Sequence, residues 1–183
     1  MIDLELILKQ CRKNNRQAQA DLYNYLAPKL LGLCLRYLRD RDEAEDVMQD
    51  AFVKIFTSIH TFKGEGSIEG WARRIAVNTA LDALKSRNRI HFERNLELVK
   101  SIDFTEEEQQ HLGLEELMAC MDALPMGYRT IINLFLVEGF THKEIGEKLG
   151  ISESTSRSQC VRARQALMKL IKARADASIA KNA

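Results

Sequence analysis

The sequence predicts an all-α protein made of two helical domains joined by an acidic linker, the C-terminal domain being a helix-turn-helix. Helix-breaking residues are scarce, with 2 Pro and 9 Gly among 183 residues. Apolar residues recur at spacings of three and four, as they do on the buried face of an amphipathic helix. The composition, 45% hydrophobic and 29% charged, is that of a globular protein.

The first domain, residues 1–94, is expected to begin with two helices. Ala18–Tyr25 carries an apolar stripe. Pro28 suits the first turn of a new helix, because that position needs no backbone N–H donor. The apolar series then continues to Leu38, so we expect one helix to end and another to start at Pro28.

Two longer helices complete this domain. Asp42 is expected to cap a helix that runs to about Phe56. The glycines of Thr61–Gly66 predict a loop, and Ser67 is expected to cap a helix that ends near Arg87.

Charge is unevenly distributed although the net charge is only +1. Residues 101–121 hold six acidic residues and no Lys or Arg, which predicts a linker at residues 95–112. Residues 85–94 hold four bases against one acid, and residues 157–174 hold six bases and no acid. Two basic stretches indicate two nucleic-acid faces.

The second domain, residues 113–183, should contain helices at Leu114–Ala123 and Tyr128–Glu138, with a break at Pro125. A helix-turn-helix follows. Thr141 and Glu144 have capping-box spacing, Gly150 ends the first helix and Ser152 caps the second. The stripe that faces the core of the second helix is formed by Cys160, Ala163, Leu167 and Leu170.

The outward part of this second helix suits the major groove of DNA, because it is basic and carries short side chains. Its candidate readers are Arg157, Ser158, Val161 and Arg162. A helical hairpin with a solvated basic face is the alternative interpretation of the same pattern.

The scattered cysteines and histidines predict no metal site, no cofactor and no disulfide, as expected for a cytoplasmic protein. No catalytic residues are expected, since no nucleophile–base pair or phosphate loop is present. No signal peptide or transmembrane run was found, so we expect no membrane insertion.

The segment Phe62–Arg89 combines a glycine-containing loop, an aromatic, an amide and a basic tail. Trp71, Ile75 and Asn78 lie within reach of one side of its helix. Such a surface is suited to single-stranded DNA with an extruded base. Trp71 is equally compatible with a place in the core.

Three blocks in order resemble the extracytoplasmic-function (ECF) sigma factors of bacterial RNA polymerase. FKGEGSIEGWARRIAVNTALDALK is similar to the family's region two, and RDRDEAEDVMQDAFVKIF to its polymerase-binding helix. ALPMGYRTIINLFLVEGFTHKEIGEKLGISESTSRSQCVRARQAL is similar to region four. The resemblance covers about residues 15–172 and implies a non-enzymatic protein that binds core RNA polymerase and directs promoter recognition, melting and transcription initiation.

The resemblance also assigns roles to residues and names partners. The implied partners are core RNA polymerase, promoter DNA and, as a candidate that no residue identifies, an anti-sigma factor. Polymerase binding falls to Asp46, Gln49, Asp50 and Phe52, although Phe52 also suits the core. The residues implied to contact the melted non-template strand at the minus-ten element are Phe62, Lys63, Gly64, Trp71, Ile75 and Asn78. The minus-thirty-five element falls to Arg157, Ser158, Val161 and Arg162.

Several positions depart from the family pattern and leave the promoter sequence open. Ala72 and Arg73 replace a usual Leu-Tyr pair, and Ile68 replaces an aromatic. Val161 is smaller than the frequent aromatic or His. Ser156 stands where an apolar residue is usual, and its hydroxyl needs a partner such as the backbone carbonyl one turn back.

Three other functions are alternatives to this interpretation. A self-sufficient helix-turn-helix repressor or activator would bind an operator without polymerase and would leave the Phe62–Arg89 pattern unexplained. No motif supports an enzymatic function, because Gly64-Glu65-Gly66 alone is too short for a phosphate loop. A helical adaptor would bind polymerase but not DNA.

Overall fold

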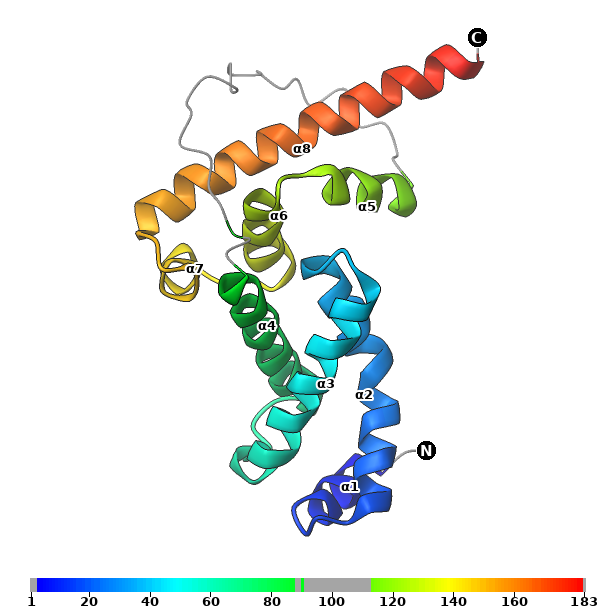
Figure 1. The fold of residues 1–183 in the computed structure, drawn as a ribbon, viewed down its shortest axis with the longest axis vertical. Coiled ribbons are helices and arrows are strands. Elements are labelled where there is room, and N and C mark those ends of the chain that lie inside the picture. The colour runs from blue at the N-terminus through cyan, green and yellow to red at the C-terminus, as the bar shows by residue number, and fades with distance from the viewer. Residues whose placement is uncertain (1–2, 88–89, 91–112, 183) are drawn as a thin grey trace. The chain divides into compact units, whose positions relative to one another are not determined.

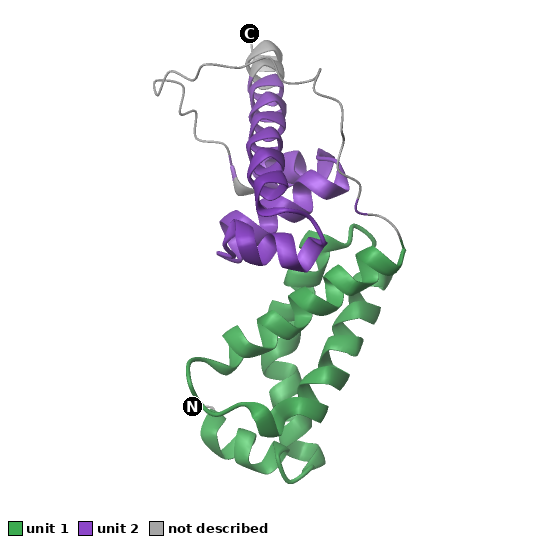
Figure 2. Ribbon diagram, turned by 90° about the vertical axis from the view of Figure 1, so that its left-hand side faces the viewer, with its two compact units in different colours: residues 1–87 green, residues 88–183 purple. Residues whose placement is uncertain are grey.

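The computed structural model describes the backbone of residues 3–87, 90 and 113–182, and every regular element in these ranges is a helix. The chain divides into two compact units, residues 1–87 and residues 88–183 (Figure 2). The predicted domain boundary after Arg94 and the predicted linker, residues 95–112, lie outside the described residues. The all-α fold with two helical domains is confirmed.

The first unit is a bundle in which α2, α3 and α4 pack on one another and α1 packs on α2 (Figure 1). Its core is formed by leucines, isoleucines and small residues. The 3₁₀ turn η1 leads from α3 into the loop before α4. The elements are α1 (Leu4–Cys11), α2 (Arg16–Tyr37), α3 (Arg41–Ser58), η1 (Ile59–Thr61) and α4 (Ile68–Ser86).

The helix α2 continues through Pro28, so the predicted new start there is wrong. Pro28 lacks an N–H and leaves the carbonyl oxygen of Asn24 without its helical donor, a defect that costs about 3 kcal/mol. The buried stripe nevertheless continues across the proline, and each buried leucine contributes about 1.5–3 kcal/mol. Burial therefore outweighs the lost hydrogen bond. The stripe consists of Leu22, Leu26, Leu30 and Leu33.

The caps of the next two helices differ in how well the sequence predicted them. The prediction that Asp42 caps α3 is wrong, because Oδ1 of Asp40 accepts the backbone N–H of Glu43 at 2.9 Å. Asp42 lies in the first turn, where a carboxylate favours the helix dipole without capping. Ser67 caps α4 as predicted, and its Oγ accepts the N–H of Gly70 at 3.0 Å.

The second unit contains a helical pair, a π-helical turn and the helix-turn-helix. Pro125 separates α5 from α6 as predicted. No helix in the described part of the chain is long and apolar enough to cross a membrane. The elements are α5 (Leu114–Ala123), α6 (Met126–Ile132), η3 (Asn133–Val137), α7 (His142–Leu149) and α8 (Glu153–Asn182).

Candidate nucleic-acid interfaces

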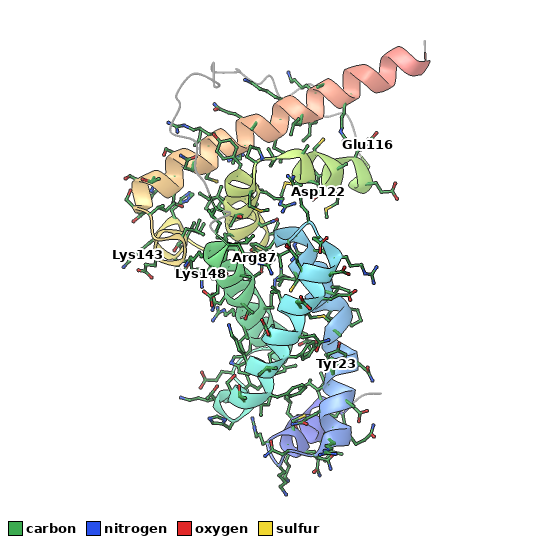
Figure 3. All side chains as sticks on the ribbon, in the orientation of Figure 1. Tyr23, Arg87, Glu116, Asp122, Lys143 and Lys148 are labelled. Atoms are coloured by element: carbon green, nitrogen blue, oxygen red, sulfur yellow. The ribbon has the colours of Figure 1, made fainter. Side chains whose placement is uncertain are left out.

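The helix-turn-helix begins with the predicted capping box. Oγ1 of Thr141 accepts the backbone N–H of Glu144 at 3.3 Å, and Oε2 of Glu144 accepts the backbone N–H of Thr141 at 2.8 Å. These reciprocal bonds satisfy two otherwise unpaired donors at the start of α7. Lys143 and Lys148 project from this helix (Figure 3), and Lys148 lies over the ring of Phe140.

The turn between α7 and α8 is tight because two glycines remove side-chain bulk. Gly150 adopts a left-handed conformation (φ 69°) that ends α7. A Cβ on Gly146 would lie 2.7 Å from the carbonyl oxygen of Ile151, so only glycine fits there without a shift. Ser152 then caps α8 as predicted, and its Oγ accepts the N–H of Thr155 at 3.0 Å. The start of α8 is thereby held firmly against α7.

The predicted reading face of α8 is presented to solvent, with one exception. Arg157, Ser158 and Val161 are exposed, and Val161 keeps 56% of its surface accessible. Arg162 is half-buried and is therefore less available. Arg157 forms an ion pair with Glu153 at 2.5 Å, which holds its guanidinium along the outer face of the helix.

Ser156 lies on the core-facing stripe as expected, but its hydroxyl does not use the backbone carbonyl we expected. Its Oγ lies 3.0 Å from Nδ1 of His142 on α7, and the side chain is fully buried. The ring of His142 also stacks on Phe135, with centroids 4.4 Å apart. Desolvation by burial lowers the pKa of His142, and the charge of Arg157 lowers it further. A single sequence offers no signal that could pair residues 14 positions apart.

The loop before α4 has a fixed base and an exposed tip. Gly64 and Gly66 take left-handed conformations, with φ of 84° and 82°, and Lys63–Gly66 are exposed. Phe62 is not part of this tip, contrary to the role expected for it. Its ring is 6% exposed and packs on Trp71 with centroids 5.6 Å apart. Phe62 therefore shapes the base of the loop. Burial of its ring against Trp71 removes apolar surface from water and stabilises this position of the chain.

One side of α4 continues from this loop. Trp71 and Ile75 are half-buried, and Asn78 is exposed. Arg74 is exposed at the same helical spacing. It was not among the residues predicted from the sequence, although its position three residues after Trp71 places it on the same side of the helix. In the basic tail, Arg87 forms an ion pair with Glu43 on α3 at 2.7 Å, which ties the end of α4 to α3.

The outward face of α3 carries three of the four residues expected to bind polymerase. Asp46, Gln49 and Asp50 are exposed. Phe52 is only 2% exposed and packs in the core, so its expected direct contact is not available in this structure. Its neighbour Val53 is 63% exposed, and at a spacing of three from Asp50 it extends the outward face.

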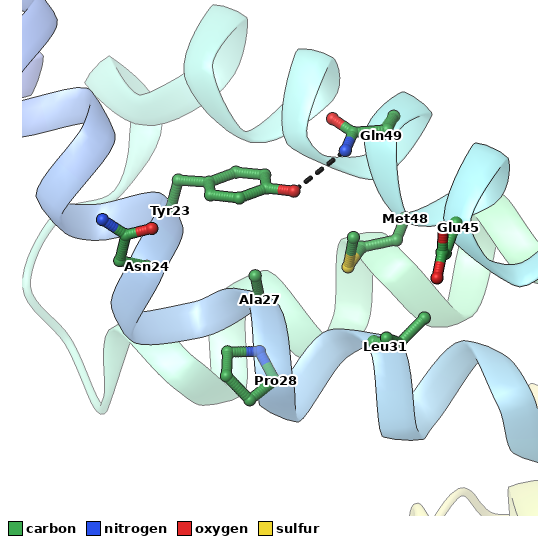
Figure 4. A pocket seen from close by; sticks show the side chains of 8 residues that line it. All are labelled: Tyr23, Asn24, Ala27, Pro28, Leu31, Glu45, Met48 and Gln49. Atoms are coloured by element: carbon green, nitrogen blue, oxygen red, sulfur yellow. Dashed lines mark hydrogen bonds between the residues drawn. The ribbon is translucent and has the colours of Figure 1, made fainter.

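A groove of about 500 Å³ lies between parts of α2 and α3 beside this face (Figure 4). Nε2 of Gln49 crosses it and donates to the hydroxyl of Tyr23 at 2.9 Å. Its lining is part apolar and part polar, and it consists of Tyr23, Asn24, Ala27, Pro28, Leu31, Glu45, Met48 and Gln49.

Titratable side chains show no metal-binding arrangement in the parts of the chain that the structure describes. All four cysteines are free and buried. Burial raises the pKa of Cys34 to about 11, so its thiol stays protonated and behaves as a packing group.

Comparison with known proteins identifies both units. Sigma-70 region 2 matches residues 22–90, and sigma-70 region 4 matches residues 114–167. The RNA polymerase sigma-H factor of Pseudomonas aeruginosa is 30% identical over 155 residues, which cover 78% of this chain and 80% of that protein. The ECF RNA polymerase sigma factor SigE of Mycolicibacterium smegmatis is 33% identical over 153 residues, or 80% of this chain and 59% of the relative.

A solved structure shares the fold. The sigma factor RpoE of Bartonella quintana, crystallised with the anti-sigma factor NepR, matches 84% of this chain and 96% of its own with a TM-score of 0.53 and 21% identity. The two region matches and the relative covered over most of its length show that the chain belongs to the ECF sigma factors of RNA polymerase, a non-enzymatic family that directs promoter-specific transcription initiation.

Proposed function

We propose that this sigma factor divides promoter recognition between its two units while core RNA polymerase holds both. The C-terminal unit reads the minus-thirty-five element as duplex DNA. The N-terminal unit captures unpaired bases of the minus-ten element and binds the polymerase. The site of action is the cytoplasm, and an anti-sigma factor is a candidate second partner.

The exposed face of α8 is the observation that carries the proposal. The capped and glycine-tightened turn holds the first turns of α8 rigidly, and rigid presentation is what groove reading requires. Arg157 supplies donors for guanine edges or phosphates, and Val161 supplies an apolar contact for a thymine methyl group. Lys143 on α7 is exposed where the first helix of such a motif crosses the DNA backbone.

The loop tip Lys63–Gly66 and the outward side of α4 form the surface for melted DNA. Two left-handed glycines allow the backbone of the tip to approach a base closely, because no Cβ intervenes. Asn78 offers an amide for reading the edge of the base, and Arg74 and Lys63 offer charges for phosphates. Capture of an extruded base costs least when the base is already unpaired, so binding favours the open strand.

The outward face of α3 and the adjoining groove form the surface for core polymerase. Asp46 and Asp50 supply negative charge, and Val53 supplies an apolar contact. Following the family resemblance, we assign this surface to the clamp helices of the largest polymerase subunit.

The charge of the free chain supports a division of labour with polymerase. A net charge of +1 gives little counterion-release energy. Free sigma factor should therefore bind promoter DNA weakly, and polymerase should be required to place the two DNA faces on one promoter.

Run-off transcription from a promoter library, with core polymerase and this protein, tests the proposal. We expect transcripts from a subset of promoters that share two spaced elements, and none without the protein. Tight operator binding without polymerase would indicate a self-sufficient repressor or activator. Polymerase binding without promoter selection would indicate an adaptor, and either result would overturn the proposal.

A further inference from the structure

The side chain of Arg12, which directly follows α1, bonds to the backbone at the base of the loop before α4. Nη2 of Arg12, the residue that ends α1, donates to the backbone carbonyl oxygen of Phe62 at 2.7 Å. The two residues are 50 positions apart, so the bond connects the N-terminal helix with a loop that is distant in the sequence. A guanidinium–carbonyl bond is charge-assisted and therefore stronger than a neutral one.

The turn that carries Arg12 is itself well fixed. Asn14 adopts a left-handed conformation (φ 58°), and its N–H donates to the carbonyl of Cys11 at 2.9 Å. The N–H of Asn15 donates to the carbonyl of Gln10 at 3.2 Å. Cys11 is fully buried and attaches the end of α1 to the core. The backbone that carries the Arg12 side chain is therefore held in place by these contacts.

The tip of the loop has little else to hold it. A Cβ placed on Gly64 or Gly66 would meet no atom within 4 Å, so this backbone is not packed against the unit. Its position depends on its two ends. Ser67 fixes one end by capping α4. Phe62 fixes the other end by its ring against Trp71, by its N–H bond to the carbonyl oxygen of Ile59 at 3.3 Å, and by its carbonyl bond to Arg12.

We propose that Arg12 is a positioning residue for minus-ten base reading, which makes α1 part of the recognition machinery although it touches no base. The bond to Phe62 sets the direction in which the chain leaves the core, and hence where Lys63–Gly66 meet the extruded base. This inference rests on the proposed function of the loop. Loss of the bond leaves the Phe62 end of the tip held only by the ring contact with Trp71 and by the Phe62 N–H bond to Ile59. The tip then samples more positions and discriminates less well between bases.

The test compares Arg12→Ala with Lys13→Ala in the full-length protein bound to core polymerase. Lys13 is the adjacent exposed residue and carries the same charge, so the pair separates the carbonyl bond from a general effect of charge. Bubble templates carry the library-selected promoter with each minus-ten position replaced in turn by the other three bases. The readout is the ratio of transcription between the preferred base and the others.

We expect Arg12→Ala to lower this ratio about two- to tenfold, the range that loss of one hydrogen bond produces. Polymerase affinity should stay at the wild-type value, the melting temperature should fall only by the few degrees that one lost hydrogen bond costs, and Lys13→Ala should leave the ratio unchanged. Trp71 is the single tryptophan of the chain and packs on Phe62, so its quenching by acrylamide should increase in Arg12→Ala alone.

Three results would overturn the proposal. An unchanged ratio in Arg12→Ala would remove Arg12 from base reading. An equal loss in both variants would assign the effect to charge, as for a phosphate contact. A parallel loss of polymerase affinity and thermal stability would make the bond merely structural. Failure of the proposed function is distinct, because the wild-type protein would then show no base preference on these templates.

Discussion

The hydroxyl oxygen of Ser156 lies 3.0 Å from Nδ1 of His142, so a hydrogen bond joins the two helices of the helix-turn-helix inside their buried contact. The bond lies next to Arg157, the foremost candidate reader of the upstream promoter element. This polar pair makes the interface sensitive to the protonation of His142.

The first prediction is that His142 titrates below 6.5 in the folded protein, since burial and Arg157 both disfavour the imidazolium. Between the lowered pKa and about 6.5 the unfolded chain then binds more protons than the folded one, so the free energy of unfolding falls as the pH falls through this window. NMR titration of the imidazole measures the pKa directly.

Two charge variants serve as controls for this titration. Arg157→Ala should raise the pKa of His142, because a repelling cation is removed, and Glu153→Gln should lower it, because an attracting anion is removed. A pKa at or above 6.5 in the wild-type protein would contradict the burial seen here.

The second prediction concerns the reading face of α8. Arg157→Ala should weaken use of the upstream element by about 1–3 kcal/mol if it reads a base, and by less if it contacts phosphate only. Arg162→Ala should have the smaller effect, because Arg162 is half-buried. Transcription from promoters with altered upstream bases separates these cases.

Arg174→Ala provides the control for both variants. Arg174 is exposed on the same helix but lies about 25 Å further along its axis. If all three variants transcribe equally from every altered promoter, the face containing Arg157 does not read DNA.

The third prediction concerns polymerase binding by α3. Asp46→Arg should reduce affinity for core polymerase while changing the free energy of unfolding by no more than about 0.5 kcal/mol, as is usual for exposed positions. Glu5→Arg on α1 makes the same charge reversal on another helix. Pull-down with unchanged yield for Asp46→Arg would place the interface elsewhere.

The fourth prediction uses two neighbours with opposite environments. Phe52→Ala should destabilise the N-terminal unit by about 3–5 kcal/mol, because it empties a packed aromatic site between Tyr23 and Phe56. Val53→Ala should leave stability nearly unchanged and weaken polymerase binding, since its side chain is exposed. Urea denaturation followed by Trp71 fluorescence reports the first effect. Equal stability of the two variants would argue against the core position of Phe52.

Local signals in the sequence were sufficient for much of this fold. The capping box of Thr141 and Glu144, the turn at Gly150 and the caps Ser67 and Ser152 each involve residues within a few positions of one another. Their geometry depends on little else, and all are present in the structure.

Features that depend on packing were harder to predict. Pro28 signals a helix start locally, but a leucine stripe that runs past it decides the outcome. Phe62 has the chemistry for base contact, yet the ring turns to Trp71 nine residues later. The partners of Ser156 and Arg12 lie 14 and 50 residues away, beyond the reach of any helical periodicity.

Permanganate footprinting of unpaired thymines tests the central claim most directly. Residues 63–66 are replaced by a Gly-Ser segment of equal length, and Phe62 is kept because it is buried. With core polymerase, wild-type protein should open duplex promoters, whereas the variant should not open them although it still binds polymerase and the upstream element. A pre-melted bubble should restore only part of its transcription, because base reading is also lost. Full opening of duplex promoters by the variant would contradict the claim and reduce this loop to a connector between two helices.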